Sequence, residues 1–317
     1  MKVLVTRRPP GRALAMLAAE HDVDCWDGDR PMPHDELLAR IADVDGLYCM
    51  LTDRIDATTI EAAPRLRAVS QMAVGVDNVD VTALARAGIP LGHTPDVLTE
   101  ATADLAVGLL LAGARRIPEG VDHVRAGRWG PWDPELLMGS DVSSSTVGIV
   151  GLGRIGTAVA RRLQGFGCRL LATSRSPKPT LEAVLDLERV PLEVLLAEAD
   201  HVVLTVPLDE HTHHLIDADA LRRMRPTAGV VNVARGPVVD TEALADALDE
   251  GLIAWAALDV TDPEPIDPGH RLVAHPRCTV IPHLGSSTVG TRSAMAELAA
   301  ENLLAGLAGR PMPAGFA

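Results

Sequence analysis

Three side chains in the second half of the chain suit proton and charge transfer, and each follows a short apolar segment typical of a buried strand. They are Arg235, Glu264 and His283. The carboxyl ends of parallel strands form the sheet edge at which ligands bind, so we expect the three side chains to share one crevice. An arginine there can bind a carboxylate and polarise a keto oxygen, a histidine can donate a proton, and a glutamate can hold and charge the imidazole. Together they predict the reduction of a 2-oxo acid by an incoming hydride.

A glycine-rich loop directly after the apolar residues 147–150 indicates where the hydride donor binds. The loop reads Gly151, Leu152, Gly153, Arg154, Ile155 and Gly156. The first glycine permits a tight turn, the second lets the backbone approach a pyrophosphate, and the third allows the following helix to pack closely on the strand. The amides at the helix N-terminus are then available to an anion. Because a strand-like segment precedes the loop and a helical one follows it, we predict a dinucleotide site.

The end of the next strand-like segment distinguishes between the two nicotinamide dinucleotides. In NAD-binding sheets an acidic residue there accepts hydrogen bonds from the ribose hydroxyls. Residues 157–181 contain no aspartate or glutamate, and the segment ends instead in Ser174, Arg175 and Ser176. Two hydroxyls and a guanidinium suit a 2′-phosphate, so we predict a preference for NADP(H), with NAD(H) as the other possible cofactor. The alternative is that Arg175 stacks on adenine or is a solvated surface charge.

The composition of the chain excludes several other classes of function. Among 317 residues, 29 Lys+Arg stand against 43 Asp+Glu, and the net charge of −14 disfavours nucleic acid and anionic membranes as partners. Aromatic residues make up 2%, too few for a base-stacking surface. The four cysteines lie far apart in no metal-binding or disulfide pattern, so we expect no metal site. The N-terminus lacks the apolar run of a signal peptide, and we expect a cytoplasmic protein.

Strand-like and helical segments alternate along the whole chain, which predicts an α/β fold with two Rossmann-like, doubly wound parallel sheets. The first strands are expected at residues 3–6, 46–50, 66–72 and 89–93. The second series is expected at residues 146–150, 169–173, 201–206, 229–233, 254–260 and 279–281. The helical segment 100–116 links the two series, and the last one, 291–307, can return to the first. We therefore predict a discontinuous substrate-binding domain, residues 1–98 completed by 287–317, and a dinucleotide-binding domain, residues 99–286.

In the order and spacing of its motifs, nearly the whole chain resembles the D-isomer-specific 2-hydroxyacid dehydrogenases. The shared motifs are the glycine loop and residues 233–236, 257–260, 263–265 and 282–286. The resemblance implies that Arg235 binds substrate, that His283 is the acid and base, and that Glu264 is its partner. It also implies cofactor contacts at Val233, Ala234, Asp259 and Gly285, with Asp259 beside the nicotinamide carboxamide. The family fold implies a homodimer formed through the cofactor domain.

Within that family, the chain is most similar to glyoxylate and hydroxypyruvate reductases, which implies small 2-oxo acids as substrates. The likeness lies in residues 72–75, 94–99 and 174–176, and in Trp129 and Trp132. By this resemblance the amides of Val74 and Gly75 would hold the substrate carboxylate, and Leu51 would line the pocket. Trp132 would help to close it, in some relatives from the neighbouring subunit. Trp132 is equally consistent with a core or dimer-interface anchor, and Leu51 with a core residue.

Two other functions stay open at this point. One is an NADH-dependent D-2-hydroxyacid dehydrogenase for another 2-oxo acid, a difference that would lie in the pocket lining. The other is a corepressor-like protein that senses NAD(P)(H). Arg235, Glu264 and His283 together argue against the sensor, since sensing requires no proton donor. We expect reduction of glyoxylate to glycolate and of hydroxypyruvate to D-glycerate by hydride transfer, with His283 as the proton donor.

Overall fold

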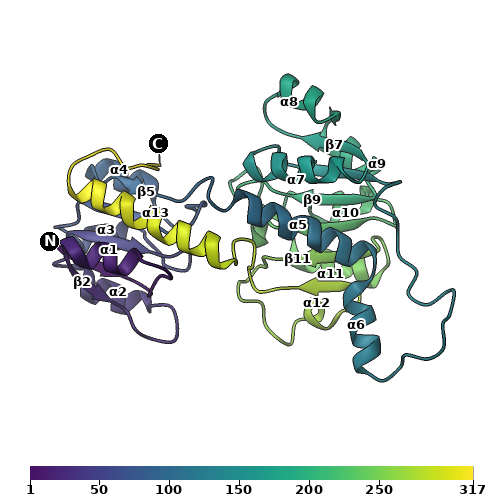
Figure 1. The fold of residues 1–317 in the computed structure, drawn as a ribbon, viewed down its shortest axis with the longest axis horizontal. Coiled ribbons are helices and arrows are strands. Elements are labelled where there is room, and N and C mark those ends of the chain that lie inside the picture. Colours follow the sequence, from purple (N-terminus) through teal and green to yellow (C-terminus); the bar gives the residue numbers. More distant parts are fainter. Residues whose placement is uncertain (317) are drawn as a thin grey trace. The chain divides into compact units, whose positions relative to one another are not determined.

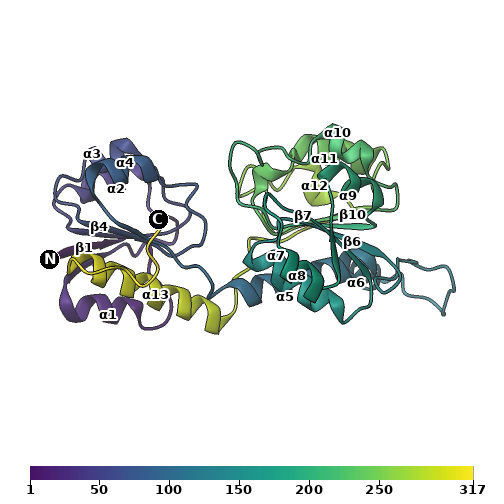
Figure 2. The same cartoon turned by 90° about the horizontal axis from the view of Figure 1, so that it is seen from above.

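The computed structural model describes residues 1–316, which divide into two units. One unit contains Met1–Leu98 and the chain from Ser286 onward, and the other contains Thr99–Gly285. Each unit has its own parallel β-sheet with helices on both faces (Figures 1 and 2). The predicted fold class, two doubly wound parallel-sheet units, is therefore confirmed.

The first unit contains a five-stranded sheet in the order β2-β1-β3-β4-β5, in which every neighbouring pair is parallel. Its strands are β1 (Lys2–Val5), β2 (Asp22–Cys25), β3 (Gly46–Cys49), β4 (Ala68–Gln71) and β5 (Leu91–Gly92). One face is covered by α1 (Ala13–Glu20) and α13 (Val289–Leu307), and the other by α2 (His34–Ile41), α3 (Ala57–Glu61) and α4 (Val81–Ala87), as Figure 2 shows. Helix α13 thus returns the C-terminal part of the chain to this unit.

The second unit contains a seven-stranded parallel sheet in the order β12-β11-β10-β9-β6-β7-β8. Its strands are β6 (Thr146–Val150), β7 (Arg169–Thr173), β8 (Leu187–Arg189), β9 (His201–Leu204), β10 (Gly229–Asn232), β11 (Trp255–Leu258) and β12 (Cys278–Val280). One face carries α5 (Thr99–Ala114), α6 (Ile117–Arg125), α7 (Arg154–Gln164) and α8 (Pro179–Val184) (Figure 2). The other carries α9 (Leu192–Glu198), α10 (Ala218–Arg223), α11 (Thr241–Asp249) and α12 (Arg271–Ala274) (Figure 2). The chain order reverses at β6, which creates the switch point where ligands bind in open α/β sheets.

Helices on both faces of each sheet bury the central strands, whose residues are mostly apolar. Strands β3, β4, β9, β10 and β11 are buried at every position, which is the pattern of a parallel sheet covered by helices. Glycine lets the large ring of Trp255 pack against the sheet, because a Cβ on Gly229 would lie 2.0 Å from that ring. Among residues 1–316, no helix is both long and apolar enough to cross a membrane.

Two strands of the structure were not predicted, β2 and β8, and both lie at the outer edge of a sheet. Strand β2 has partly exposed residues with aspartate at alternate positions, and β8 contains two exposed charged residues, Glu188 and Arg189. Edge strands have one free side and commonly carry charge, so they lack the apolar run by which buried strands are recognised. Their local sequence therefore resembles that of loops and helix ends.

Candidate active site

His283 and Glu264 form a hydrogen-bonded pair after two neighbouring strands, β12 and β11. The Nδ1 atom of His283 lies 2.7 Å from Oε1 of Glu264, and both side chains are partly exposed. His283 has a φ of 52°, a left-handed conformation that is uncommon for a residue with a side chain and that concentrates at functional sites. Because an ionised carboxylate only accepts hydrogen bonds, Nδ1 carries the proton. Nε2 is then the ring nitrogen at which a proton can be exchanged.

Asp259, directly after β11, holds the turn that contains His283. Its carboxylate accepts hydrogen bonds from the backbone amides of Leu284, at 2.5 Å, and Gly285, at 2.9 Å. Its carbonyl oxygen accepts from the amide of His283, at 2.9 Å. The residue is 2% exposed, and burial raises the pKa of its carboxyl while the two amides act in the opposite direction. The sequence predicted a cofactor contact for Asp259, and the structure adds that it positions the His283 turn.

Arg235 lies three residues after the end of β10, and the side chain of Asn232 holds its backbone. The Oδ1 atom of Asn232 accepts from the amide of Ala234 at 3.0 Å, and Nδ2 donates to the carbonyl of Arg235 at 2.9 Å. Asn232 is 1% exposed, and Val233 and Ala234 are 6% exposed each. Arg235 and the His283–Glu264 pair therefore follow three neighbouring strands, β10, β11 and β12, at one edge of the sheet. Sequence reasoning did not identify Asn232, whose role depends on side-chain hydrogen bonds.

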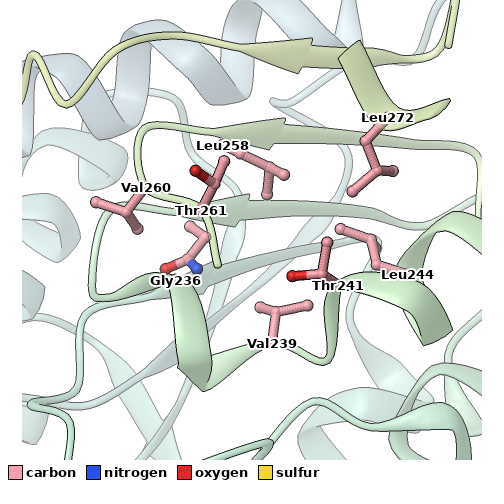
Figure 3. A pocket seen from close by; sticks show the side chains of 9 residues that line it. Gly236, Val239, Thr241, Leu244, Leu258, Val260, Thr261 and Leu272 are labelled. Carbon is pink, nitrogen blue, oxygen red and sulfur yellow. The ribbon is translucent and has the colours of Figure 1, made fainter. Parts of the chain in front are cut away.

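A small cavity lies behind the Arg235 turn, and its lining shows how tightly the Arg235 and Glu264 loops pack (Figure 3). It has a volume of about 10 Å³ and is lined by Asn232, Gly236, Val239, Thr241, Leu244, Leu258, Val260, Thr261 and Leu272. This space is on the order of one water molecule, so it is too small for a substrate. A Cβ on Gly236 would lie 1.9 Å from the carbonyl oxygen of Thr261, so only glycine permits this approach of the Arg235 turn to the loop that carries Glu264.

Two threonine hydroxyls attach the Glu264 loop to this packed region. Thr241 donates a hydrogen bond to the carbonyl of Asp262 at 2.8 Å, and Thr261 donates to the carbonyl of Pro263, also at 2.8 Å. Both contacts lie within three residues of Glu264. The carboxylate that holds His283 therefore extends from a backbone that is fixed on the side away from solvent.

The glycine loop has the geometry that an anion-binding turn requires. Gly151 has a φ of 99°, and its carbonyl oxygen accepts a hydrogen bond from the hydroxyl of Thr205, at 2.7 Å. Gly156 packs on the same turn, because a Cβ there would lie 2.0 Å from the Gly151 oxygen. Gly153 caps α7 with no side-chain hydrogen bond, and no atom lies within 4 Å of the position of its Cβ. The space beside Gly153 at the N-terminus of α7 is thus open, which fits the diphosphate of a dinucleotide.

The remaining residues of the glycine loop differ in how a cofactor can contact them. Leu152 is 2% exposed and belongs to the apolar core of the unit, so only its backbone faces the loop. Arg154 is exposed and Ile155 is partly buried. The buried Gly285 lies in the His283 turn, at the same edge of the sheet.

Basic side chains gather at the end of β7, where the sequence predicts the 2′-phosphate. The guanidinium of Arg175 is 79% exposed and lies 3.5 Å from the carboxylate of Asp209. The ammonium of Lys178 donates to the carbonyl of Leu152 in the glycine loop. Arg189 of β8 donates to the carbonyl of Ser174 at 2.9 Å. Sequence reasoning missed Arg189, because β8 was not predicted as a strand of this sheet.

Two serine hydroxyls, those of Ser174 and Ser176, also lie in the turn after β7. Ser174 donates to the carbonyl of Ser176 at 2.9 Å, which tightens the turn after β7. Both serines lie outside the sheet, directly after the last residue of the strand. The turn therefore presents two short polar side chains beside Arg175.

In the first unit, residues 72–78 follow β4 and are called the β4 loop. This loop contains Val74 and Gly75 and is held by two side-chain amides. Nε2 of Gln71 donates to the carbonyl of Gly75 at 2.6 Å and to Oδ1 of Asn78 at 2.9 Å. Nδ2 of Asn78 donates to the carbonyl of Asp53 at 2.6 Å, which joins the β4 loop to the turn after β3. Gln71 is fully buried. Neither amide was predicted as a site residue.

Leu51 lies in the turn after β3 and is 39% exposed, so the structure does not place it in the core. Asp53 fixes this turn: its carboxylate accepts from the amide of Met50 at 2.7 Å and from the hydroxyl of Thr6. Burial raises the pKa of Asp53, and these hydrogen bonds oppose the rise. Trp132 is 86% exposed, which rules out the core interpretation of this residue within the described chain.

The second unit defines a class of protein. A parallel sheet carries a glycine loop at its switch point, and an imidazole paired with a carboxylate follows two strands of the same edge. These are the parts that a nicotinamide-dependent dehydrogenase requires.

Comparisons with known proteins narrow the class to a family. Residues 107–285 match the model of the D-isomer specific 2-hydroxyacid dehydrogenase, NAD binding domain. The chain is 48% identical over 308 residues to a glyoxylate reductase of Thermococcus onnurineus, covering 96% of this chain and 92% of that protein. It is 45% identical over 317 residues to the human glyoxylate reductase/hydroxypyruvate reductase, covering 99% and 97%. The chain belongs to the D-isomer specific 2-hydroxyacid dehydrogenase family.

A solved structure of the family provides a direct comparison. An NADPH-dependent glyoxylate/hydroxypyruvate reductase from Sinorhizobium meliloti, determined with NADP and malonate, matches with a TM-score of 0.87 and 34% sequence identity. The match covers 100% of this chain and 96% of that one. The resemblance predicted from the sequence motifs is thus confirmed at the level of the family and its glyoxylate and hydroxypyruvate reductases.

Proposed function

We propose that this protein is an NADPH-preferring reductase that converts glyoxylate to glycolate and hydroxypyruvate to D-glycerate. The observation that carries the proposal is the 2.7 Å hydrogen bond between His283 and Glu264 at the sheet edge that also carries Arg235. A protein that only senses a dinucleotide requires no such proton donor. The names of relatives that cover nearly the whole chain support the same substrates.

His283 is the proton donor of the proposed reaction. Glu264 holds Nδ1, so that Nε2 is the position from which the proton is given up. When bound, reduced nicotinamide supplies the hydride that reaches the keto carbon. The proton from Nε2 goes to the oxygen of the former keto group, and the imidazole returns to its neutral form. Asp259 keeps the turn of His283 in place through the amides of Leu284 and Gly285.

Backbone and side-chain donors bind the substrate in this proposal. The amides of Val74 and Gly75 hold the substrate carboxylate, and the guanidinium of Arg235 holds the carboxylate and polarises the keto oxygen. Leu51 lines the pocket and limits the size of the substrate side chain. Trp132 helps to close the pocket and, with its 86% exposure, is available to another subunit.

The cofactor is held by the glycine loop and by the turn after β7. Gly151, Gly153 and Gly156, with the first amides of α7, accommodate the diphosphate, and Leu152, Arg154 and Ile155 complete this loop. Val233, Ala234, Asp259 and Gly285 line the nicotinamide end. Ser174, Arg175 and Ser176 bind the 2′-phosphate, and the nearby cations of Lys178 and Arg189 support that preference for NADPH.

An exposed apolar face on the second unit supports a homodimer. Helix α6 has no buried residue, and its Ile117, Val121 and Val124 are 51%, 42% and 51% exposed. The segment that follows exposes Trp129 and Met138, at 72% and 66%. Ile117, Val121 and Val124 are spaced to lie on one face of α6, and exposed apolar faces mark interfaces in soluble proteins. Light scattering is expected to give twice the mass of the chain, and a Val121→Asp, Val124→Asp variant is expected to give the monomer.

The proposal is tested by the initial rate of NADPH and NADH oxidation with glyoxylate and with hydroxypyruvate. We expect fast turnover of both acids, faster with NADPH. Arg175→Ala is expected to weaken NADPH far more than NADH, because only NADPH carries the 2′-phosphate, whereas the exposed Arg125→Ala serves as a matched control. A preference for NADH would support the NADH-dependent alternative, and no turnover in any pairing would refute the proposed substrates.

A further inference from the structure

We propose that His93, held by the segment after α13, is a positioning residue that orients the amide of Gly75 toward the substrate carboxylate. The inference rests on the proposed function, which assigns carboxylate binding to Val74 and Gly75. His93 directly follows β5, the edge strand beside β4. Its imidazole contacts the β4 loop rather than any reacting group, so its effect is exerted through the backbone.

The β4 loop is anchored by its carbonyl oxygens. The carbonyl of Ala73 accepts a hydrogen bond from the amide of Thr94 at 2.8 Å, and the carbonyl of Val74 lies 2.9 Å from Nδ1 of His93. In a trans peptide the C=O and the following N–H point in opposite directions. Thr94 therefore orients the amide of Val74, and His93 orients the amide of Gly75.

The two amides themselves have no acceptor within the part of the chain that the structure describes. None of residues 1–316 accepts a hydrogen bond from the N–H of Val74 or Gly75. The carbonyls of both residues are bonded, that of Val74 to His93 and that of Gly75 to Gln71 at 2.6 Å. Successive backbone N–H groups that no protein atom accepts from are available to an anion. A hydrogen bond to a carbonyl also polarises its peptide group, which makes the N–H a stronger donor.

The tautomer of His93 follows from the same contact. A carbonyl oxygen only accepts, so Nδ1 must carry the proton in both the neutral and the charged ring. The bond to Val74 therefore survives a change of protonation at Nε2. A residue that keeps a donor at this place is expected to substitute for His93 in part.

Three contacts from α13 and from the residues after it hold His93. The amide of His93 donates to the carbonyl of Ala314 at 3.0 Å, and its own carbonyl accepts from Nδ2 of Asn302 at 2.9 Å. The ring of Phe316 packs edge-on against the imidazole, with 5.3 Å between the ring centroids. Asn302 is fully buried in α13, and its Oδ1 accepts from the amide of Ala314 at 2.8 Å.

The residues after α13 also pair with the edge of the first sheet. Gly315 pairs with Gly92 of β5 in an antiparallel bridge, and the amide of Phe316 donates to the carbonyl of Leu91 at 2.7 Å. Residues far apart in the sequence thus meet at one imidazole. Its orientation determines that of the Gly75 amide.

The kinetic test compares His93→Ala with His93→Asn, which keeps a side-chain N–H donor. Loss of one hydrogen bond worth about 1 kcal/mol predicts a KM for glyoxylate raised roughly 5-fold or more in His93→Ala, with kcat within about twofold of the wild type. His93→Asn is expected to recover most of the affinity. The Kd of NADPH, measured by fluorescence, is expected to stay unchanged in both variants. An unchanged KM in a folded His93→Ala protein would overturn the inference.

A second measurement keeps the inference testable apart from the proposed function. In ¹⁵N-labelled, deuterated protein without substrate, the Gly75 amide proton is expected to move upfield in His93→Ala and less in His93→Asn. Phe316→Ala is expected to produce a smaller shift of the same sign. Wild-type protein that reduces no 2-oxo acid would refute the proposed function alone, while an unmoved Gly75 amide in His93→Ala would refute the positioning role.

Discussion

We propose that the glycine loop of the second unit and the β4 loop of the first both present backbone amides to an anion, but in different ways. In the glycine loop, the amides belong to the first turn of α7, whose N-cap is Gly153. The helix dipole and the unsatisfied N–H groups then act together. No helix begins directly after Val74 and Gly75, since α4 starts at Val81. The β4 loop depends instead on side chains that hold its carbonyls.

This difference predicts different sensitivity to mutation. The glycine loop depends on close approach of its own backbone, so a single added methyl group disrupts it. The β4 loop depends on hydrogen bonds that each contribute about 1 kcal/mol, so single substitutions there weaken binding by smaller steps. The following experiments test that contrast, from the largest expected effect to the smallest.

Gly156→Ala is expected to have the largest effect. Its Cβ would lie 2.0 Å from the carbonyl oxygen of Gly151 and 2.8 Å from the hydroxyl of Thr205, so α7 must move away from the loop. Overpacking of this kind costs roughly 1–3 kcal/mol, and we expect NADPH to bind about 10- to 100-fold more weakly. Fluorescence titration with NADPH measures the Kd, and thermal unfolding measures the accompanying loss of stability.

Gly153→Ala provides the matched control, because no protein atom lies within 4 Å of its Cβ position. Its melting temperature is expected to equal that of the wild type. NADPH is nevertheless expected to bind more weakly, because the methyl group would occupy the space in which the diphosphate approaches. Wild-type affinity in this variant would show that the diphosphate binds elsewhere.

Two buried carboxylates, Asp259 and Asp53, give the next effect, since each fixes a turn in its own unit. In Asp259→Asn, one of the amides of Leu284 and Gly285 would face an N–H donor, and the His283 turn would shift. Misplacement of a catalytic group by about 1 Å can cost on the order of 100-fold, and we expect kcat for glyoxylate to fall by about 10- to 100-fold. The steady-state rate of NADPH oxidation at saturating glyoxylate measures this change in kcat.

Asp53→Asn is the counterpart in the first unit. It weakens the turn that contains Leu51, so we expect KM for glyoxylate to rise by about 3- to 10-fold and kcat to change little. Steady-state kinetics of both aspartate variants on one substrate separate the two roles. A fall in kcat without a change in KM for Asp53→Asn would contradict the assignment of the first unit to substrate binding.

The smallest expected effect concerns how each sheet buries a polar ring. The hydroxyl of buried Tyr48 in β3 donates to the carbonyl of Ala296 at 3.1 Å. His201 in β9 is fully buried, and neither ring nitrogen has a hydrogen-bond partner among residues 1–316. Tyr48→Phe is therefore expected to lower the free energy of unfolding by about 1 kcal/mol, whereas His201→Leu is expected to leave it unchanged or raise it at neutral pH.

Buried His201 also predicts that the free energy of unfolding depends on pH. Burial lowers the pKa of His201 below its ordinary value, so the unfolded chain binds the proton more tightly than the folded chain. The free energy of unfolding then falls as the pH drops below about 6.5, by up to about 1.4 kcal/mol per pH unit, until the lowered pKa is reached. Urea unfolding at about pH 7.5 and about pH 5.5 is expected to show a smaller difference in His201→Leu than in the wild type. An equal difference would show that His201 does not titrate in this range.

The sequence by itself determined the features whose geometry is local. Alternating strand and helix patterns predicted the two parallel sheets, because strands buried on both faces are mostly apolar. The glycine loop was recognisable because consecutive residues, 151–156, make the whole turn. Edge strands β2 and β8 were missed because one of their sides is free, so their sequences carry charge.

Only the tertiary structure decided how the site residues are held. Asp259 positions the His283 turn through hydrogen bonds to Leu284 and Gly285, which lie 25 and 26 positions further along the chain. Asn302 reaches His93 over 209 positions, and no pattern along the chain marks that contact. A hydrogen bond forms wherever folding brings a donor to an acceptor, so its partners leave no periodic signal. The chemistry of this protein can be read along the chain, but the orientation of the groups that perform it depends on contacts that exist only after folding.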